Sequence, residues 1–522
     1  MTDRAYAHSS LPIVNRAAAF EGRTAIVDRR GLHPYGNLLG ASARIARSLL
    51  GERSDLLEAP VALMVSPGFD YVAALWGIWR AGGIAVPLCI DHPAPEIDYV
   101  LADSGAGTVV YDPLFEARLS PLADARGATL LSTTSVIRGE GATRERLPDV
   151  QPFRRAMILY TSGTTGGPKG AVTTHSNLRA QVTALVEAWG WTRDEHILHA
   201  LPLHHTHGIV NALLCSLCSG ATCEMLPRFD ADAVWERFVA GGVTLFMAVP
   251  TAYVKLIAAW ENALAPERSA MSEAAGRLRL MVSGSAALPA AVFERWREIT
   301  GHALLERYGM TEIGMALSNP LEGERRPGTV GRPLPGIRVR LVDDDGDPIL
   351  EEGVPGRIQV RGPGVFLEYW KRHEATREAF RDAWFDTGDE AVVEDGYYRI
   401  LGRVSIDIIK SGGYKISALE VEEVLRTHPA IADCAVVGVP DPEWGERVCV
   451  AVLEARDGGL TEERGPTAEA LTVEALTLEA LRAWAKERLA AYKIPRELRL
   501  LDELPRNAMG KVIKTEVRTL FE

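Results

Sequence analysis

The feature that most constrains this chain is a run of hydroxyl side chains and glycines, YTSGTTGGPKG, at residues 160–170. Glycine lets consecutive backbone N–H groups turn toward one anion, hydroxyls add donors, and a lysine adds mobile positive charge. An apolar run precedes the loop and a helical pattern follows it, which predicts a buried strand, the loop and then a helix. This order is typical of a nucleotide-phosphate site. The candidate contacts are Thr161, Ser162, Gly163, Thr164, Thr165, Gly166 and Lys169.

Two other interpretations of this loop are less favoured. A Walker-type loop requires Gly-Lys-Ser/Thr, whereas Lys169 lies between Pro168 and Gly170, so the motif fails on both sides of the lysine. A flexible surface loop would accept glycine and serine in any order and does not require a preceding strand. Nucleotide binding is therefore the hypothesis that we carry forward.

Length and composition limit the classes of protein. A chain of 522 residues predicts one large domain plus a smaller one, because single cores stop growing at roughly 250 to 300 residues. The net charge of −12 argues against binding to nucleic acid or to anionic membranes, which depends on basic patches. No segment reaches the roughly 18 apolar residues of a membrane span. We expect a cytoplasmic protein, and the sequence does not indicate its oligomeric state.

The order of expected elements predicts an α/β fold. Strand-like and helical runs alternate over residues 24–221 and again over 229–314, which indicates two α/β subdomains with a largely parallel sheet. Short strands separated by turn residues over 328–403 predict an antiparallel, barrel-like subdomain. A compact α+β unit follows. The expected domains are 1–403 and 404–522.

The cysteines offer one alternative chemistry. Six cysteines are too few and too scattered in this chain for a disulfide framework. His204, His205 and His207 precede Cys215 and Cys218, a spacing that suggests zinc. The segment around the two cysteines is apolar on nearly every face, however, and free cysteine commonly behaves as a small buried hydrophobe. We favour core packing for this pair.

Four further motifs follow the glycine loop in the chain. They are ERYGMTE at 306–312, WFDTGD at 384–389, GRVSIDIIKSGGYKIS at 402–417 and PRNAMGK at 505–511. With these motifs in this order, essentially the whole chain resembles the acyl-adenylate-forming superfamily of acyl-CoA synthetases, luciferases and peptide-synthetase adenylation domains. The resemblance implies that ATP and a carboxylate give an acyl-AMP and pyrophosphate, and that the acyl group then passes to a thiol.

The resemblance assigns roles in the adenylation step. Lys511 would bridge the carboxylate and the α-phosphate, Thr311 would bond the α-phosphate, and Tyr308 would stack on adenine. Glu312 would bind Mg²⁺, a hard cation that prefers carboxylate and phosphate oxygens. Negative charge gathers during the attack on phosphorus, so positioned cations should supply much of the rate enhancement. The alternative for Lys511 is a solvated surface lysine, and the alternative for Tyr308 is a side chain that only packs in the core.

The resemblance also assigns residues around the expected hinge. Asp389 would accept hydrogen bonds from the ribose hydroxyls and Arg403 would contact the same nucleotide, with a structural salt bridge as the alternative. The small domain is expected to be mobile, with Gly412 and Gly413 lining a pantetheine tunnel unless they are only turn glycines. Relatives often have two acidic residues after the Gly-Arg pair, whereas here three residues precede Asp407. No carrier-domain serine motif is present in the sequence, so free coenzyme A is the expected acceptor.

Arg307 is the clue to the acid. In this superfamily the residue before the motif tyrosine faces the acyl pocket, and an arginine there implies an anionic substrate tail, because a guanidinium binds a carboxylate through two parallel hydrogen bonds. The surrounding segments resemble malonyl-CoA and methylmalonyl-CoA synthetases, so malonate is the expected substrate and methylmalonate a second one. An outward salt bridge to Glu306 is the alternative for Arg307. The other expected pocket residues are His207, which would gate or polarise the pocket, and Thr206, Ser283 and Met310.

Other functions remain open at this point. The chain could act on another short-chain or fatty acid, or serve a separate carrier protein, and a panel of acids tested with and without coenzyme A separates these functions. A non-catalytic nucleotide-binding relative is the third possibility, although the joint presence of Lys511, Glu312 and Asp389 speaks against a decayed site.

Overall fold

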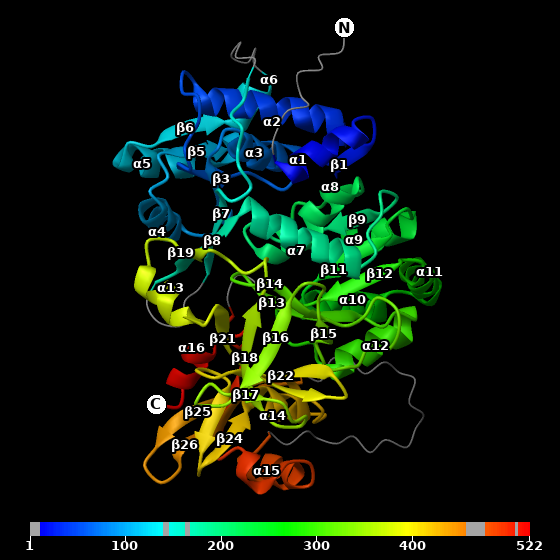
Figure 1. The fold of residues 1–522 in the computed structure, drawn as a ribbon. Coiled ribbons are helices and arrows are strands. Elements are labelled where there is room, and N and C mark those ends of the chain that lie inside the picture. Colours follow the sequence, from blue (N-terminus) through cyan, green and yellow to red (C-terminus); the bar gives the residue numbers. More distant parts are fainter. Residues whose placement is uncertain (1–10, 139–145, 162–166, 456–475, 507–509) are drawn as a thin grey trace. The chain divides into compact units, whose positions relative to one another are not determined.

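The computed structural model describes five stretches of the chain, residues 11–138, 146–161, 167–455, 476–506 and 510–522 (Figure 1). Two compact units share the chain. The first consists of Met1–Leu288, Val292–Val339 and Gln359–Asp386, and the second of Pro289–Ala291, Arg340–Ile358 and Thr387–Glu522. The predicted mixed α/β class, with a larger N-terminal part and a smaller C-terminal part, is confirmed. The predicted boundary after Arg403 stays a prediction.

A seven-stranded sheet in the first unit has the order β19-β8-β7-β4-β3-β5-β6. The strands from β6 to β7 are parallel, and β8 and β19 are antiparallel to their neighbours. All four residues of β4 are buried, as expected for a parallel strand covered on both faces. The strands are β3 (Pro60–Met64), β4 (Ile84–Pro87), β5 (Thr108–Tyr111), β6 (Thr129–Ser132), β7 (Arg155–Thr161), β8 (Lys169–Thr174) and β19 (Glu368–Tyr369).

The element that follows the glycine loop differs from the prediction. The loop joins β7 to the antiparallel strand β8, and helix α7 (His175–Ala188) begins only after β8. Thr174 caps the helix in a reciprocal pair of hydrogen bonds with Asn177, so the Ser/Asn signal marked a real helix start but the preceding residues form a strand. The loop is therefore a strand-to-strand connection, and a helix N-terminus does not follow it directly.

A nine-stranded sheet in the same unit has the order β15-β14-β13-β12-β11-β9-β10-β1-β2. The strands from β1 to β13 along this order are parallel, so the predicted first α/β stretch contributes strands to both sheets. The strands are β1 (Thr24–Asp28), β2 (Gly31–Pro34), β9 (His196–His199), β10 (Thr222–Met225), β11 (Leu245–Ala248), β12 (Leu280–Ser283), β13 (Leu305–Met310), β14 (Gly314–Ser318) and β15 (Arg332–Pro333).

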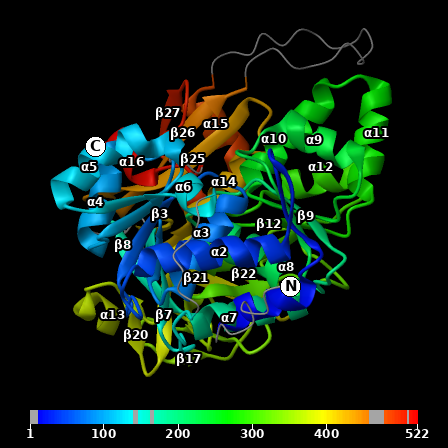
Figure 2. The ribbon, with the colours of Figure 1, turned by 90° about the horizontal axis from the view of Figure 1, so that it is seen from above.

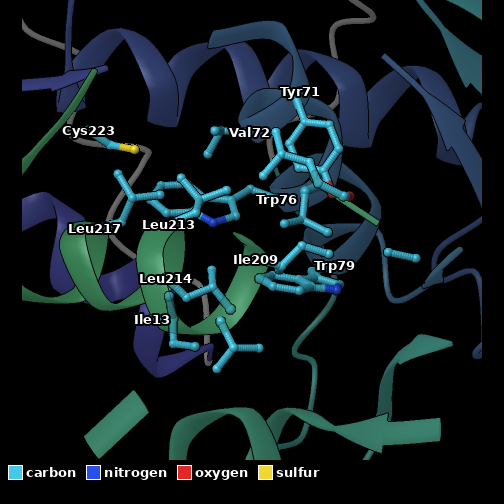
Figure 3. Packing of buried hydrophobic residues seen from close by; sticks show 14 of the residues in the cluster. Ile13, Tyr71, Val72, Trp76, Trp79, Ile209, Leu213, Leu214, Leu217 and Cys223 are labelled. Atoms are coloured by element: carbon cyan, nitrogen blue, oxygen red, sulfur yellow. The ribbon is translucent and has the colours of Figure 1, made fainter. Parts of the chain in front are cut away.

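Helices α2 (Tyr35–Leu50) and α3 (Phe69–Arg80) lie side by side in two perpendicular views (Figure 1 and Figure 2). A Cβ added at Gly77 would lie 2.5 Å from Cγ2 of Ile45, so this close helix approach requires glycine. Figure 3 shows Trp76 and Trp79 of α3 facing the π-helical segment His207–Leu214 within one buried cluster. This packing anchors the helix that begins at His207.

The remaining helices of the first unit lie at its surface or between its sheets. Helices α9 to α12 surround a second core that contains Trp235, Tyr253 and Trp296. The bounds are α1 (Pro12–Ala17), α4 (Ala94–Ser104), α5 (Glu116–Arg126), α6 (Thr133–Arg138), α8 (Cys215–Ser219), α9 (Ala231–Ala240), α10 (Pro250–Asn262), α11 (Ala265–Gly276), α12 (Ala290–Thr300) and α13 (His373–Ala379).

The barrel-like prediction is confirmed as a β half-barrel. Its sheet has the order β17-β16-β18-β21-β20, and β22 pairs with β21. The strands are β16 (Arg338–Val342), β17 (Pro348–Ile349), β18 (Gly356–Arg361), β20 (Phe380–Arg381), β21 (Trp384–Glu394) and β22 (Tyr397–Arg403).

The second unit contains a five-stranded sheet of order β24-β23-β26-β25, with β27 parallel to β26. One face packs on α14 and α15, with Val421, Leu425 and Leu481 in the shared core. The elements are β23 (Ile408–Ser411), β24 (Tyr414–Ser417), α14 (Ala418–Leu425), β25 (Ile431–Asp441), β26 (Gly445–Glu454), α15 (Leu478–Lys486), β27 (Glu497–Leu501) and α16 (Lys514–Thr519).

The expected absence of a membrane span can be checked only for the described residues. Among them, no helix is long and apolar enough to cross a bilayer.

The pair Cys215 and Cys218 lies in apolar surroundings. Cys215 is fully buried in the same hydrophobic cluster as Trp76 and Trp79, and Cys218 packs against that cluster. Among the described residues, neither cysteine belongs to a group of possible metal ligands, so core packing holds for this pair.

Candidate active site

The predicted acid pocket is built where strand β12 ends beside the first residues of its parallel neighbour β13. Ser283 closes β12 and pairs with Glu306 of β13, which places Arg307 one residue further along the edge. Side chains alternate along a strand, so Glu306 and Arg307 point to opposite faces. Oε1 of Glu306 accepts a hydrogen bond of 3.0 Å from the backbone N–H of Leu288. Carboxyl ends of parallel strands are the usual position of α/β binding sites.

Arg307 is buried, with 3% of its surface exposed. Its Nη2 donates to Oγ of Ser285 over 3.3 Å, and among the described residues its Nε has no hydrogen-bond partner. Burial lowers the pKa of Arg307 to about 10, and the charge of Glu306 opposes this shift only in part. The alternative of an outward salt bridge is therefore wrong, because the guanidinium faces the interior and forms no ion pair within the described chain.

His207 lies at the other end of a short polar chain. Its Nδ1 is 3.3 Å from Oγ of Ser285, the hydroxyl that accepts from Arg307. Burial, with a contribution from Arg307, holds the pKa of His207 well below its usual value, so the ring is neutral. A hydroxyl that accepts from Arg307 is left to donate to Nδ1, which places the ring proton on Nε2. Among the described residues this Nε2 has no partner.

The loop before His207 is tightly closed. A Cβ on Gly208 would lie 2.3 Å from the carbonyl oxygen of Pro202, so the turn requires glycine at this position. That carbonyl belongs to a segment held from both sides: Oη of Tyr71 donates to the carbonyl of Leu203, and Nε2 of His199 is 3.0 Å from the carbonyl of Gly208. Burial also lowers the pKa of His204 to about 2 and of His205 to about 4.

The other predicted pocket residues lie on the same two loops and strands. Thr206 and Ser283 are buried, and Met310 is half-buried at the end of β13. Among the described residues, the hydroxyl of Ser283 has no hydrogen-bond partner. The substrate roles of Thr206, Ser283 and Met310 stay predictions.

Glu312 and Lys169 come together through a residue that the sequence did not suggest. Oη of Tyr369 donates to Oε1 of Glu312 over 2.9 Å, and Nζ of Lys169 lies 5.4 Å from the centre of the Tyr369 ring. Strand pairing explains the arrangement, because β19 places Tyr369 opposite Ala171 in β8. The lysine of the glycine loop and the predicted Mg²⁺ ligand therefore share one neighbour.

The other nucleotide residues of this unit follow the same strands. Thr161 ends β7, and its hydroxyl donates to the carbonyl of Lys169 over 3.4 Å. Tyr308 and Thr311 are half-buried at the end of β13 and in the turn after it. Their roles stay predictions, and the other loop residues lie outside the described chain: Ser162, Gly163, Thr164, Thr165 and Gly166.

Asp389 and Arg403 face each other in the second unit. They are paired residues of β21 and β22, and Nε of Arg403 donates to Oδ1 of Asp389 over 3.0 Å. This ion pair agrees with the alternative of a structural salt bridge between the two residues. The same pair also places a carboxylate next to a guanidinium. Contact with ribose stays a prediction.

Gly412 and Gly413 form the two-residue turn between β23 and β24. Their φ values are 57° and 82°, as a type I′ hairpin turn requires of both central residues. The turn thus explains both glycines without a ligand. Their place in a pantetheine tunnel stays a prediction.

Two lysines, one that ends the C-terminal motif and one just after it, lie in different surroundings. Lys511 is exposed. Lys514, three residues later, forms ion pairs of 2.7 Å with both Asp407 and Glu422. The pKa of Asp407 is lowered even though burial alone would raise it. The lowering comes chiefly from Lys514 and to a lesser extent from the charge of Lys511. Oδ2 of Asp407 also accepts from the backbone N–H of Arg403, which ties the motif to the predicted hinge.

Sequence patterns alone did not single out Ser285, Tyr369 or Lys514. Ser285 lies in the segment SGSAALP, where Ser283 was the candidate, and only its position between Arg307 and His207 distinguishes the two serines. Tyr369 and Lys514 have partners far away in sequence, so local spacing carries no signal for them.

The larger α/β part, the β half-barrel and the smaller C-terminal part together form the architecture of adenylate-forming enzymes. Residues 13–370 match the AMP-binding enzyme family, and residues 420–511 match the AMP-binding enzyme C-terminal domain. The chain belongs to the AMP-binding enzyme family.

Similar proteins narrow the class further. The chain is 46% identical to malonate–CoA ligase ACSF3, mitochondrial, of Mus musculus, over 99% of this chain and 91% of the relative. It is 39% identical to malonate–CoA ligase of Arabidopsis thaliana, over 94% of this chain and 85% of that relative. The crystal structure of ATP-bound MatB from Rhodopseudomonas palustris has a TM-score of 0.86 and 32% identity, covering 98% of this chain and 99% of that one.

Proposed function

We propose that this protein is an ATP-dependent acid–thiol ligase that converts malonate to malonyl-CoA through malonyl-AMP, releasing AMP and pyrophosphate. The observation that carries the substrate is Arg307, a buried guanidinium with no ion-pair partner among the described residues. Relatives of two kingdoms that are named malonate–CoA ligases support the same acid.

The first step joins the acid to the nucleotide. A carboxylate oxygen attacks the α-phosphorus of ATP, an acyl O–P bond forms, and the bond to pyrophosphate breaks. Lys511 would neutralise charge on the carboxylate and α-phosphate, and Thr311 would donate to the same phosphate. The carboxylate of Glu312, buried beside Tyr369 and Lys169, is a hard oxygen donor of the kind that Mg²⁺ requires, and Mg²⁺ there would offset phosphate charge.

The second step transfers the acyl group to coenzyme A. The thiol sulfur loses its proton to solvent and attacks the acyl carbonyl, a C–S bond forms, and the C–O bond to AMP breaks, so AMP leaves with the electron pair. A neutral His207 with its proton on Nε2 can donate a hydrogen bond into the pocket throughout.

A dicarboxylate suits this pocket energetically. A buried guanidinium without a counter-charge costs on the order of 3 kcal/mol, and a fatty acyl chain would leave that cost in place. The second carboxylate of malonate removes it through charge-assisted hydrogen bonds to Arg307. Methylmalonate adds one methyl group, worth about 1 to 3 kcal/mol in a pocket, so it is the expected second substrate. A cytoplasmic location and a role in fatty acid metabolism stay predictions.

A panel of acids tests the function directly. Pyrophosphate release is measured with malonate, methylmalonate, succinate, acetate, butyrate and octanoate, each with and without coenzyme A. We expect the highest kcat/KM with malonate and thioester formation only with coenzyme A. A higher kcat/KM for octanoate or butyrate would contradict the assigned acid, and no acid-dependent pyrophosphate release would contradict ligase activity altogether.

A further inference from the structure

A second cluster of reactive side chains lies in the first unit, outside the polar chain of Arg307, Ser285 and His207. Cys89, His92 and His204 each offer one possible ligand atom, and these atoms lie within 4.8 Å of one another. Cys89 and His92 belong to the loop between β4 and α4, whereas His204 comes from the loop between β9 and the helix at His207. Residues 115 positions apart in sequence are thus brought together by the fold alone.

The first loop has the geometry of a ligand turn. Cys89 and His92 are separated by two residues, and the backbone N–H of His92 donates to the carbonyl of Cys89 over 3.3 Å. This turn directs both side chains to one side. Arg118 holds the turn from outside, because its guanidinium donates to the carbonyl of Ile90 over 2.7 Å and also to that of His92.

The histidines complete the arrangement. The rings of His92 and His204 have centres 5.8 Å apart, and His204 lies against His205 with ring centres 4.0 Å apart. Nδ1 of His92 lies 3.2 Å from a carboxylate oxygen of Glu96, which leaves Nε2 for another partner. A carboxylate on the far nitrogen is the usual orienting contact of a metal-bound histidine.

We propose that Cys89, His92 and His204 bind one Zn²⁺ ion. One thiolate and two neutral imidazoles form a ligand set that favours zinc over hard cations, and three protein ligands leave a fourth position for water. Ligands of a tetrahedral zinc ion lie about 3.3 to 3.7 Å apart, so the side chains close by about 1 Å when the ion binds. Binding replaces the thiol proton of Cys89 by the S–Zn bond and releases that proton to solvent.

The ion would tie the phosphate-binding side of the seven-stranded sheet to the loop that carries Thr206 and His207. Cys89 follows β4, which is the parallel neighbour of β7, the strand that leads into the glycine loop. This site does not depend on which acid the enzyme uses. Its test therefore needs no activity measurement.

Cobalt(II) is the probe, because it occupies zinc sites and gives a thiolate-to-metal charge-transfer band. The full chain is stripped with a chelator and titrated with Co²⁺ and then Zn²⁺. We expect about one Co²⁺ per chain, with a thiolate band that Zn²⁺ abolishes. No thiolate band in the unaltered protein would overturn the proposal, whatever the variants do.

Variants locate the ion. Cys89→Ser should abolish the band, and His204→Phe, which keeps an aromatic ring, should weaken binding by at least about 100-fold. Glu96→Gln should weaken it by about 10-fold. Cys218→Ser, at a half-buried thiol outside the cluster, is the matched control and should leave the band unchanged. A band that survives Cys89→Ser, or one that disappears in Cys218→Ser, would place the ion elsewhere. Circular dichroism confirms that each variant is folded.

Discussion

Two buried cations, one in each unit, have opposite surroundings. The side chain of Lys514 is 10% exposed and forms two ion pairs of 2.7 Å, with Asp407 and Glu422. Burial alone would lower the pKa of Lys514, but the two carboxylates outweigh it and raise the pKa. Arg307 is buried at least as deeply, yet its only hydrogen bond within the described chain goes to a serine, and its pKa is lowered to about 10.

The comparison indicates that Lys514 stabilises the fold, whereas Arg307 is placed to bind a ligand. Both side chains lose water on folding, and only Lys514 recovers the loss from its own chain. The charge of Lys514 therefore belongs to the stability of the second unit. The charge of Arg307 is a cost that the folded chain retains, and such a cost persists where a ligand relieves it.

The largest expected effect is on stability, at Lys514. Lys514→Met removes the ion pairs to Asp407 and Glu422, of which Glu422 keeps a longer one with Arg426, so we expect the second unit to lose about 3 to 5 kcal/mol of unfolding free energy. Urea denaturation followed by tryptophan fluorescence measures the change. Arg499→Met is the control, because its pair with Glu497 is exposed and should contribute less than about 1 kcal/mol. Equal losses in the two variants would remove the distinction drawn for Lys514.

Lys511 is exposed, unlike Lys514, and its replacement tests whether it acts in the adenylation reaction and not in stability. Lys511→Ala should lower malonyl-AMP formation by about 100- to 1000-fold, the usual loss when one positioned group is removed from a developing charge. Thioester formation from supplied malonyl-AMP should largely survive, and the urea midpoint should stay that of the unaltered protein. Equal loss of both half-reactions would contradict the role assigned to Lys511.

The sequence predicted much of the fold and part of the site. Residue types and spacing were sufficient for the α/β class and the half-barrel, whereas the interest in Arg307, which the structure buries, came from the family resemblance. They were not sufficient for β8, because the residues after the glycine loop are compatible with either a strand or the first turn of a helix, and pairing with β7 decides between them. Contacts such as Tyr369 with Glu312 depend on which strands become neighbours, and that order is not encoded locally.

Arg307 provides the matching test on the ligand side of the comparison. Arg307→Leu should reduce kcat/KM for malonate by about 100-fold, which corresponds to about 3 kcal/mol, and should change kcat/KM for butyrate much less. Within the described chain Arg307 has no carboxylate partner, so the urea midpoint of Arg307→Leu should equal or exceed that of the unaltered protein. The urea midpoint of Lys514→Met, in contrast, should fall. An equal loss for both acids would place Arg307 outside the pocket.

The smallest expected effect comes from displacing the guanidinium without removing its charge. A Cβ added at Gly284 would lie 2.5 Å from Cζ of Arg307, and the flexible end of the arginine can move away at little cost to folding. Gly284→Ala should therefore raise KM for malonate by about 10-fold, as expected for a misplaced charge-assisted hydrogen bond, and leave butyrate and the urea midpoint nearly unchanged. Gly107→Ala is the control, because it adds a Cβ into open space at the surface, and it should change neither KM for malonate nor the urea midpoint. Gly301→Ala is unsuitable as a control, because Gly301 has a φ of 75°. If Gly284→Ala instead lowered stability as Lys514→Met does, the position of Arg307 would be fixed by packing and not held open for a substrate.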